Sequence, residues 1–202
     1  MKYLDIESLR NLNSRLSFPT SSGDRHVLGR VESYSCKVAG ADKKLYRLLE
    51  QKHQEDLEEA KGLSPEQSSL TNTFSPFGPL TQSASRKTLF YLLATLNASF
   101  PDYDFSSVPA DRFTKEPSPD SAIKSINNTL VNVGSPATLR VVRMWDSIDE
   151  IINIDECSVY SYTPDDESNH YEDENPVWSF NYSSSTRTSS ASCFSPAAAS
   201  AT

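Results

Sequence analysis

The sequence predicts an α+β fold, in which an antiparallel sheet combines N-terminal and C-terminal strands and several helices pack on it. Strand-like stretches occur near both ends of the chain, at 26–36, 157–162 and 177–182. Apolar residues at helical spacing fill most of the chain between them. A chain of 202 residues is long enough for one domain. We therefore expect the strands from both ends to meet in one sheet.

The N-terminal part of this domain, 1–61, has the predicted order helix, strand, helix. Leucines near one stripe predict a first helix over 3–16, and HVLGRVESYSC predicts a strand over 26–36 that Gly29 weakens. A second helix is expected from about Asp42. Its apolar residues at helical spacing are Leu45, Leu49 and Leu57.

Residues 62–84 separate this part from the rest of the domain. The segment is rich in Pro, Ser, Thr and Gly and has no apolar periodicity. Such a composition buries too little apolar surface to offset the entropy of ordering the chain. We expect a disordered, mobile regulatory linker.

The C-terminal part of the same domain, 85–182, begins with a central helix over 85–100, which Ser85 can cap. Two more helices are predicted where serine precedes proline, at Ser118 and at Ser135, because proline is pre-organised for the first helical position. The two C-terminal strands follow, with an acidic loop between them.

Charge is distributed unevenly along the chain. The net charge is −8, but 146–174 contains eleven Asp and Glu residues and no Lys or Arg, so this segment carries −11 and the remainder +3. An acidic protein is repelled by nucleic acid backbone. We expect no direct nucleic acid binding, whereas docking on a basic protein surface is compatible with this charge.

Several features indicate the cytosol or the nucleus. The chain has no run of about 18 apolar residues, so no membrane partner is expected. The amino end, MKYLDIESLR, has acidic residues where a signal peptide needs an apolar stretch. Cys36, Cys157 and Cys193 are far apart and lack metal-type spacing, which suits a reducing compartment.

The sequence offers little support for catalysis. It has no phosphate-binding glycine loop, dinucleotide fingerprint or metal-type His/Cys cluster, so we expect no cofactor, no metal site and no enzyme activity. One alternative is a cysteine-dependent enzyme, with Cys36 beside Lys37 as nucleophile and His26 as base. We favour a small buried thiol at a strand end, because free cysteine packs as a hydrophobe.

Two cations occupy an unusual place in the central helix. Arg86 and Lys87 lie in its first turn, where the helix dipole disfavours each positive charge by a few tenths of a kcal/mol. Either neighbouring acidic residues neutralise them, or they form a basic contact point for a partner. The sequence is compatible with both interpretations.

Three segments resemble the sequence boxes of the Maf-one family, the negative regulators of RNA polymerase III. They are MKYL…VLGRVESYSCK at 1–37, SRKTLFYLLATLNASFPDYDFS at 85–106 and VWSFNY at 177–182. CSVYSYTPD at 157–165 also resembles the stretch before the last box. The resemblance implies a non-enzymatic repressor. Such a protein binds polymerase III subunits on the clamp side and blocks engagement with the promoter-bound, Brf-containing initiation factor.

The resemblance also implies control by a regulatory kinase and phosphatase in response to nutrients. Phosphorylation of the linker keeps the protein inactive and partly cytoplasmic, and dephosphorylation admits it to the nucleus. Ser64 and Ser75, each followed by proline, resemble the sites of a TOR-type kinase. The candidate partner contacts are Lys37, Asp42, Lys43, Arg86, Lys87, Asp165, Asp166 and Glu167. The alternative function is a phosphorylation-regulated adaptor for another basic protein.

The sequence departs from the family pattern at Ser183, where relatives continue with a turn, a Lys/Arg pair and an apolar strand. Permitted codons for 183–194, read two nucleotides later, can encode such a strand, which motivates the hypothesis of a reading-frame error. As written, 183–202 is an aberrant low-complexity tail that we expect to be disordered, leaving strand 177–182 with an unpaired edge. Sequencing of the transcript tests the hypothesis, and an in-frame message for Ser183 to Thr202 would contradict it.

Overall fold

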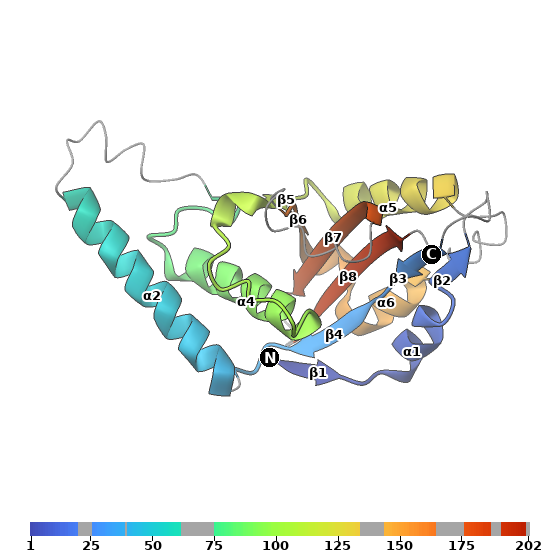
Figure 1. Ribbon diagram of the computed structural model, residues 1–202, viewed down its shortest axis with the longest axis horizontal. Helices are drawn as coiled ribbons and strands as arrows, with labels where there is room; N and C mark the ends of the chain where they lie inside the picture. The colour runs from blue at the N-terminus through green and yellow to red at the C-terminus, as the bar shows by residue number, and fades with distance from the viewer. Residues whose placement is uncertain are drawn as a thin grey trace. The chain divides into compact units, whose positions relative to one another are not determined.

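The computed structural model describes residues 1–19, 26–38, 40–61, 75–133, 144–164, 176–186 and 191–200 (Figure 1). The chain divides into two compact units, which are described separately below. The first comprises 1–2 and 36–112, and the second comprises 3–35 and 113–202. None of the helices described has the length and apolar character needed to cross a bilayer.

The second unit is built on an eight-stranded sheet. Its main path runs through β1 (Lys2–Leu4), β4 (Glu32–Ser35), β8 (Ala191–Ser200), β7 (Pro176–Thr186), β6 (Cys157–Tyr162) and β5 (Phe113–Lys115) (Figure 1). In addition, β2 (Ser17–Pro19) pairs with β3 (His26–Gly29), and β3 pairs with β8. The pairings from β5 to β8, and those of β3 and β4 with β8, are antiparallel. The predicted α+β fold, with N-terminal and C-terminal strands in one antiparallel sheet, is confirmed.

Helices of the second unit enclose an apolar core. They are α1 (Glu7–Asn13), α5 (Pro119–Val133), α6 (Met144–Ile152) and the short 3₁₀ helix η3 (Ile154–Glu156). Pro119 opens α5 as predicted, and the Ser118 hydroxyl accepts a hydrogen bond from the Ser121 N–H at 3.2 Å. The start predicted at Ser135 lies outside the described residues. The core is formed by Leu9, Leu12, Leu16, Val31, Ile126, Leu130, Met144, Ile148, Ile152, Ile154 and Cys157.

The N-terminus differs from the predicted helix over 3–16. Its first residues form β1 beside β4, and α1 begins only at Glu7. The Tyr3 ring packs edge-to-face on Tyr34, with 5.8 Å between ring centroids. Such aromatic contacts across neighbouring strands stabilise a sheet, and here they outweigh the helical spacing of the leucines.

The predicted strand over 26–36 is present as two strands, β3 and β4, interrupted after Gly29. A Cβ at Gly29 would lie 3.0 Å from the Leu16 Cβ, closer than most side-chain contacts, so glycine favours this close approach. At the interruption, the Asn13 side chain accepts from the Val31 N–H at 2.8 Å and donates to the Val31 carbonyl at 2.9 Å. Asn13 thereby satisfies backbone groups that the ladder leaves unpaired.

The C-terminal segment differs from the disordered tail that we expected over 183–202. Strand β7 continues through Thr186, and β8 lies between β7 and β4. A ladder is made by backbone groups, so a chain of Ser, Thr and Ala can pair in it. Pro196, opposite Asn181, brings no N–H to the ladder. The aromatic strand therefore has a paired neighbour in place of the free edge expected.

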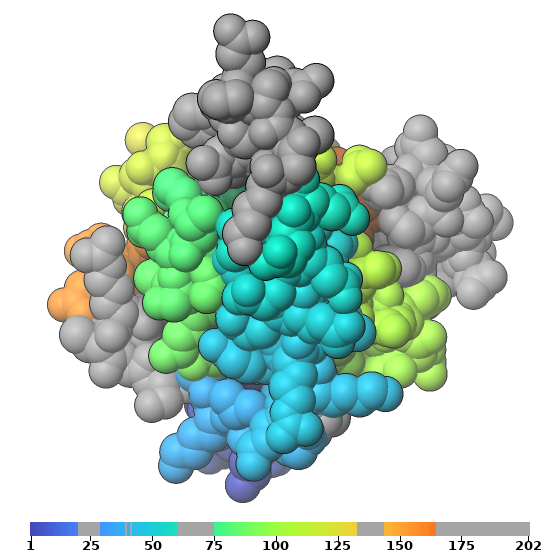
Figure 2. All heavy atoms as spheres, turned by 90° about the vertical axis from the view of Figure 1, so that its left-hand side faces the viewer, coloured from blue at the N-terminus to red at the C-terminus, as the bar shows by residue number. Residues whose placement is uncertain are grey.

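The first unit is built on two antiparallel helices, α2 (Gly40–Lys61) and α4 (Ser83–Ser99), followed by the 3₁₀ helix η1 (Ala110–Arg112). The rings of Tyr46 and Phe90 meet edge-to-face, with centroids 5.3 Å apart. One turn further along α2, Glu50 pairs with Arg86, one turn earlier on α4. Most side chains of α2 are exposed, and this long exposed helix faces the viewer in Figure 2.

The predicted boundary of the linker at residue 84 is too late. Residues 75–82 form turns, and α4 begins at Ser83, two residues before the predicted start of the central helix. The Gly78 N–H donates to the Ser75 carbonyl at 3.0 Å, and the Gln82 N–H donates to the Pro79 carbonyl at 3.0 Å. Local turn bonds thus order a segment whose composition suggested disorder. Residues 62–74 of the predicted linker lie outside the described part.

Candidate functional site

Arg86 connects three segments of the first unit. Its Nε donates to Glu50 Oε1 on α2 at 2.8 Å, and its Nη1 donates to the carbonyls of Leu80 and Thr81 at 2.9 and 3.0 Å. Its Nη1 also lies 3.3 Å from His53 Nε2. Only 17% of the Arg86 side chain is exposed. For Arg86 the structure therefore favours neutralisation by a neighbouring acidic residue over a contact with a partner.

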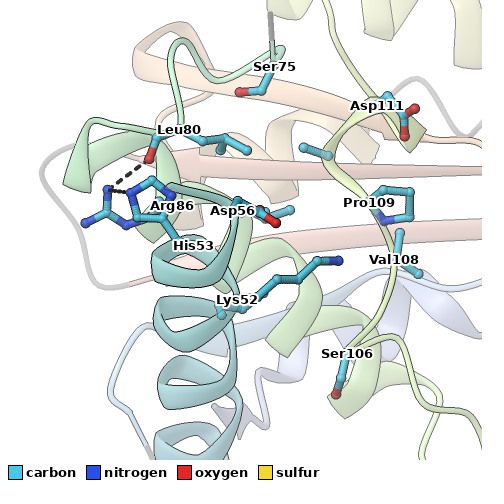
Figure 3. Close-up of a pocket in the computed structure, with 13 residues that line it drawn as sticks. Lys52, His53, Asp56, Ser75, Leu80, Arg86, Ser106, Val108, Pro109 and Asp111 are labelled. Carbon is cyan, nitrogen blue, oxygen red and sulfur yellow. Dashed lines mark hydrogen bonds between the residues drawn. The ribbon is translucent and has the colours of Figure 1, made fainter. Parts of the chain in front are cut away.

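A cavity of about 220 Å³ lies beside this network (Figure 3). Side chains from α2, from the turn at 75–80, from the start of α4 and from 106–111 converge on it. Its charged lining residues are Lys52, Asp56, Arg86 and Asp111. Ligand pockets usually measure about 300–1,000 Å³, so this cavity is small for an organic ligand. Among the described residues, no three His, Cys, Asp or Glu side chains are grouped to hold a metal ion.

The segment 106–111 is fixed at its start by a turn at Asp104. The Ser106 hydroxyl and the Ser106 N–H donate to the Asp104 carboxylate, the latter at 2.9 Å, and these bonds lower the pKa of Asp104. A lowered folded-state pKa means that the bonds contribute to stability above the ordinary pKa of aspartate. That contribution is lost as the pH falls through the lowered value.

A second concavity, of about 400 Å³, is lined by Val38 and by residues of the N-terminal half of α2 and of α4. We call it the basic groove. It is lined by Val38, Lys43, Tyr46, Arg47, Lys87, Phe90 and Tyr91. All seven residues belong to the first unit, and its volume is within the usual range of binding sites.

Aromatic rings form the floor of the basic groove. Phe90 is buried at 1% exposure and contacts both Tyr46 and Tyr91, with ring centroids 5.3 Å apart in both pairs. Tyr46 and Val38 remain 40% and 45% exposed. The floor therefore presents apolar surface to solvent on a rigid, packed base.

Three positively charged side chains also line the groove. Lys43, Arg47 and Lys87 are all exposed, and the Lys87 ammonium lies 5.7 Å from the centre of the Tyr91 ring. No lining residue is acidic, and within the described part of the chain no carboxylate pairs with these three cations. The groove thus concentrates three positive charges in a chain whose net charge is −8.

Comparison with known proteins shows a family match over the residues that line both concavities. The family model described as Maf1 regulator matches residues 27–184, which include the basic groove and the cavity. This chain belongs to the Maf1 regulator family. The resemblance to the Maf-one family found in the sequence is therefore confirmed. The family match ends at residue 184, and the departure that we expect from Ser183 onward stays a prediction.

Curated relatives and solved structures agree with membership of the Maf1 regulator family. A Schizosaccharomyces pombe protein named "Repressor of RNA polymerase III transcription maf1" is 44% identical, across 90% of this chain and 76% of its own. A Dictyostelium discoideum protein named "Repressor of RNA polymerase III transcription" is 33% identical, across 90% of this chain and 78% of its own. A crystal structure of citrus MAF1 matches with a TM-score of 0.68 at 29% identity, covering 96% of this chain and 98% of that chain.

The structure shows which candidate partner contacts are exposed to solvent and which are buried. Lys37, Lys43 and Lys87 are exposed, and the last two line the basic groove. Asp42 is buried, and its carboxylate forms an ion pair with the α-amino group of Met1. Asp42 therefore has a structural partner within its own unit and is a poor candidate for an intermolecular contact.

Other candidates are only partly described. Asp165, Asp166, Glu167 and Ser64 lie outside the described residues. Cys36 is half-buried and forms no disulfide, and the side chain of His26 is not described, so the nucleophile–base pair of the enzyme hypothesis stays untested.

Sequence reasoning missed Arg47, Tyr46 and Tyr91 as members of the basic groove. A signal was present, because Arg47 follows Lys43 by four residues and so shares its helix face. The partnership with Lys87 could not be found in this way, since it depends on how α2 packs against α4.

Ser75, one of the two phosphorylation candidates, is buried at 9% exposure. Its hydroxyl donates to the Gly78 carbonyl at 2.5 Å and accepts from the Phe77 N–H at 3.3 Å. Gly78 has a φ of +97°, which holds the turn in a conformation that favours glycine. A kinase reaches this hydroxyl only after the turn has opened.

Phosphorylation of Ser75 should therefore be slow in the folded chain. We expect a proline-directed kinase to modify Ser75 about tenfold faster in a synthetic peptide spanning 70–82 than in the intact protein, because opening the turn costs about 1.4 kcal/mol or more. Quantitative mass spectrometry of the phosphopeptide measures both rates. The S75A peptide is the control for modification elsewhere in the peptide, and equal rates at Ser75 would show that burial does not protect it.

Proposed function

We propose that this protein represses transcription by RNA polymerase III. The observation that carries the proposal is the 44% identity, over 90% of the chain, to a Schizosaccharomyces pombe protein named as a repressor of that polymerase. A second relative with the same function in its name aligns over an equal share of the chain. Identity at this level over nearly the whole chain supports a common activity in addition to a common fold.

The proposed mechanism is docking on polymerase III subunits, so that the polymerase fails to engage the Brf-type initiation factor at the promoter. The charge of the chain supports protein docking over DNA binding, since a net charge of −8 disfavours approach to phosphate backbone. The segment 146–174, which carries −11, is suited to basic protein surfaces. The exposed cations Lys37, Lys43 and Lys87 are suited to acidic ones.

The proposed regulation is phosphorylation at Ser64, which is favoured over the buried Ser75. A phosphate adds about −1.5 to −2 charges, enough to change docking onto a charged partner. In this scheme a nutrient-responsive, TOR-type kinase keeps the protein inactive and partly cytoplasmic. A phosphatase returns it to the nucleus and to the polymerase.

The order of addition in a purified transcription reaction tests this function. We expect the dephosphorylated protein, incubated with RNA polymerase III before promoter-bound initiation factor is added, to reduce transcription of a transfer RNA gene by about tenfold, corresponding to about 1.4 kcal/mol of competition. Added after the polymerase has engaged the promoter complex, it should have little effect on the first round. Radiolabelled transcript is the measurement.

Two controls make this result specific. An RNA polymerase II template in a matched reaction should be unaffected, and protein carrying phosphate at Ser64 should repress less than the S64A protein treated with the same kinase. Equal repression in both orders of addition would contradict blocked engagement. Absence of repression with the dephosphorylated protein in either order would overturn the proposed function.

A further inference from the structure

We infer that the basic groove binds an acidic protein segment that carries an apolar or aromatic side chain. This inference is independent of the polymerase proposal, because it follows from the groove alone and its test is the binding of a defined peptide. It also identifies a surface opposite in sign to the acidic segment 146–174.

The first step of the argument is charge. Lys43, Arg47 and Lys87 converge on one concavity from two helices, and no acidic residue lines it. By contrast, Arg86, next to Lys87 in the sequence, is paired with Glu50 at 2.8 Å. Three clustered, uncompensated cations favour an anionic ligand.

The second step is the exposed apolar floor. Val38 and Tyr46 are 45% and 40% exposed, and they are two of the five large hydrophobic residues that are exposed in the described part of the chain. Both line the same concavity as the three cations. Covering them requires an apolar or aromatic side chain, which a simple inorganic anion lacks. The occupant therefore needs both carboxylates and apolar groups.

The third step is pre-organisation. Phe90 is buried and holds Tyr46 and Tyr91 in fixed edge-to-face and tilted contacts. The Lys87 ammonium is held over the Tyr91 ring. Because floor and cations are positioned before binding, little ordering entropy is lost when a ligand arrives.

A peptide fits these features better than a nucleic acid strand. Single-stranded nucleic acid needs several exposed rings on which successive bases stack, whereas Phe90 is covered. An acidic peptide contributes a few carboxylates that reach three cations, and its apolar side chain covers Tyr46 and Val38.

Fluorescence anisotropy on the intact protein tests the inference. The probe is a fluorescein-labelled peptide, Glu-Glu-Asp-Phe-Glu-Asp-Leu-Glu-Glu. We expect binding that weakens as salt is raised from about 50 to 300 mM, since the Debye length shortens from about 14 to 6 Å. An analogue with amides in place of the carboxylates, and one with serine in place of Phe and Leu, should each bind about tenfold more weakly.

Protein variants locate the binding site. The double variant R47E/K87E should bind the peptide about tenfold more weakly, because two attractive charge pairs become repulsive. Y46A should bind the peptide more weakly. The affinity that it loses should be the apolar contribution, which does not depend on salt. K124E reverses one cation on α5, in the other unit, and should leave the affinity unchanged, whereas K87E alone, which makes the same charge change in the groove, should weaken it. Circular dichroism confirms that each variant is folded.

Each remaining outcome contradicts the inference. Equal binding of the acidic peptide by R47E/K87E and by the unaltered protein places the site elsewhere. Tighter binding of a fluorescein-labelled oligothymidylate than of the peptide assigns the groove to nucleic acid. Absence of peptide binding at 50 mM salt removes the site altogether, and none of these results bears on whether the protein represses transcription.

Discussion

The network centred on Arg86 is the interaction on which the first unit depends. A single guanidinium joins α2, through Glu50, to the turn before α4, through the carbonyls of Leu80 and Thr81. Because only 17% of this side chain is exposed, its charge is satisfied largely by protein groups. Loss of Glu50 would leave this largely buried charge without its ionic partner. The cost of a cation in the first turn of α4 is thus offset by tertiary contacts.

The network around Arg86 also affects where the neighbouring residue, Lys87, points. Successive residues on a helix point about 100° apart, so Arg86 directed toward Glu50 leaves Lys87 directed elsewhere. Lys87 then joins Lys43 and Arg47 around the basic groove. One turn further along α4, Phe90 packs on Tyr46 and forms the floor. The pairing of α2 with α4 therefore creates the groove and holds its charges in place.

Much of the fold could be predicted, because local patterns determine it. Pro119 after Ser118 marks the start of α5, and the valine and tyrosines of CSVYSY, which favour strands, mark β6. The errors occurred where distant contacts override the local pattern. The Tyr3–Tyr34 contact draws the first residues into a strand, and backbone pairing with β4 and β7 orders a tail that composition had suggested was disordered.

The candidate site could be predicted only in part, for the same reason. Lys43 and Lys87 were among the candidate partner contacts, and both line the groove. Arg86 and Asp42, by contrast, form ion pairs inside the unit. These pairs depend on tertiary packing, so local sequence spacing could not show which candidates stay unpaired. At Ser75 the sequence predicted an accessible phosphorylation site, whereas the structure shows a buried hydroxyl held in a turn.

Thermal unfolding of the matched variants R86A and K87A tests the central claim most directly. Removal of the Arg86 guanidinium takes away the protein partner of Glu50 and of two carbonyls and should cost about 2 kcal/mol, lowering the melting temperature by about 4–8 °C. Lys87 is an exposed contact residue, so K87A should change stability by less than about 0.5 kcal/mol. The account predicts a large difference between two neighbouring cations. Equal effects of the two substitutions, or a larger effect of K87A, would contradict it.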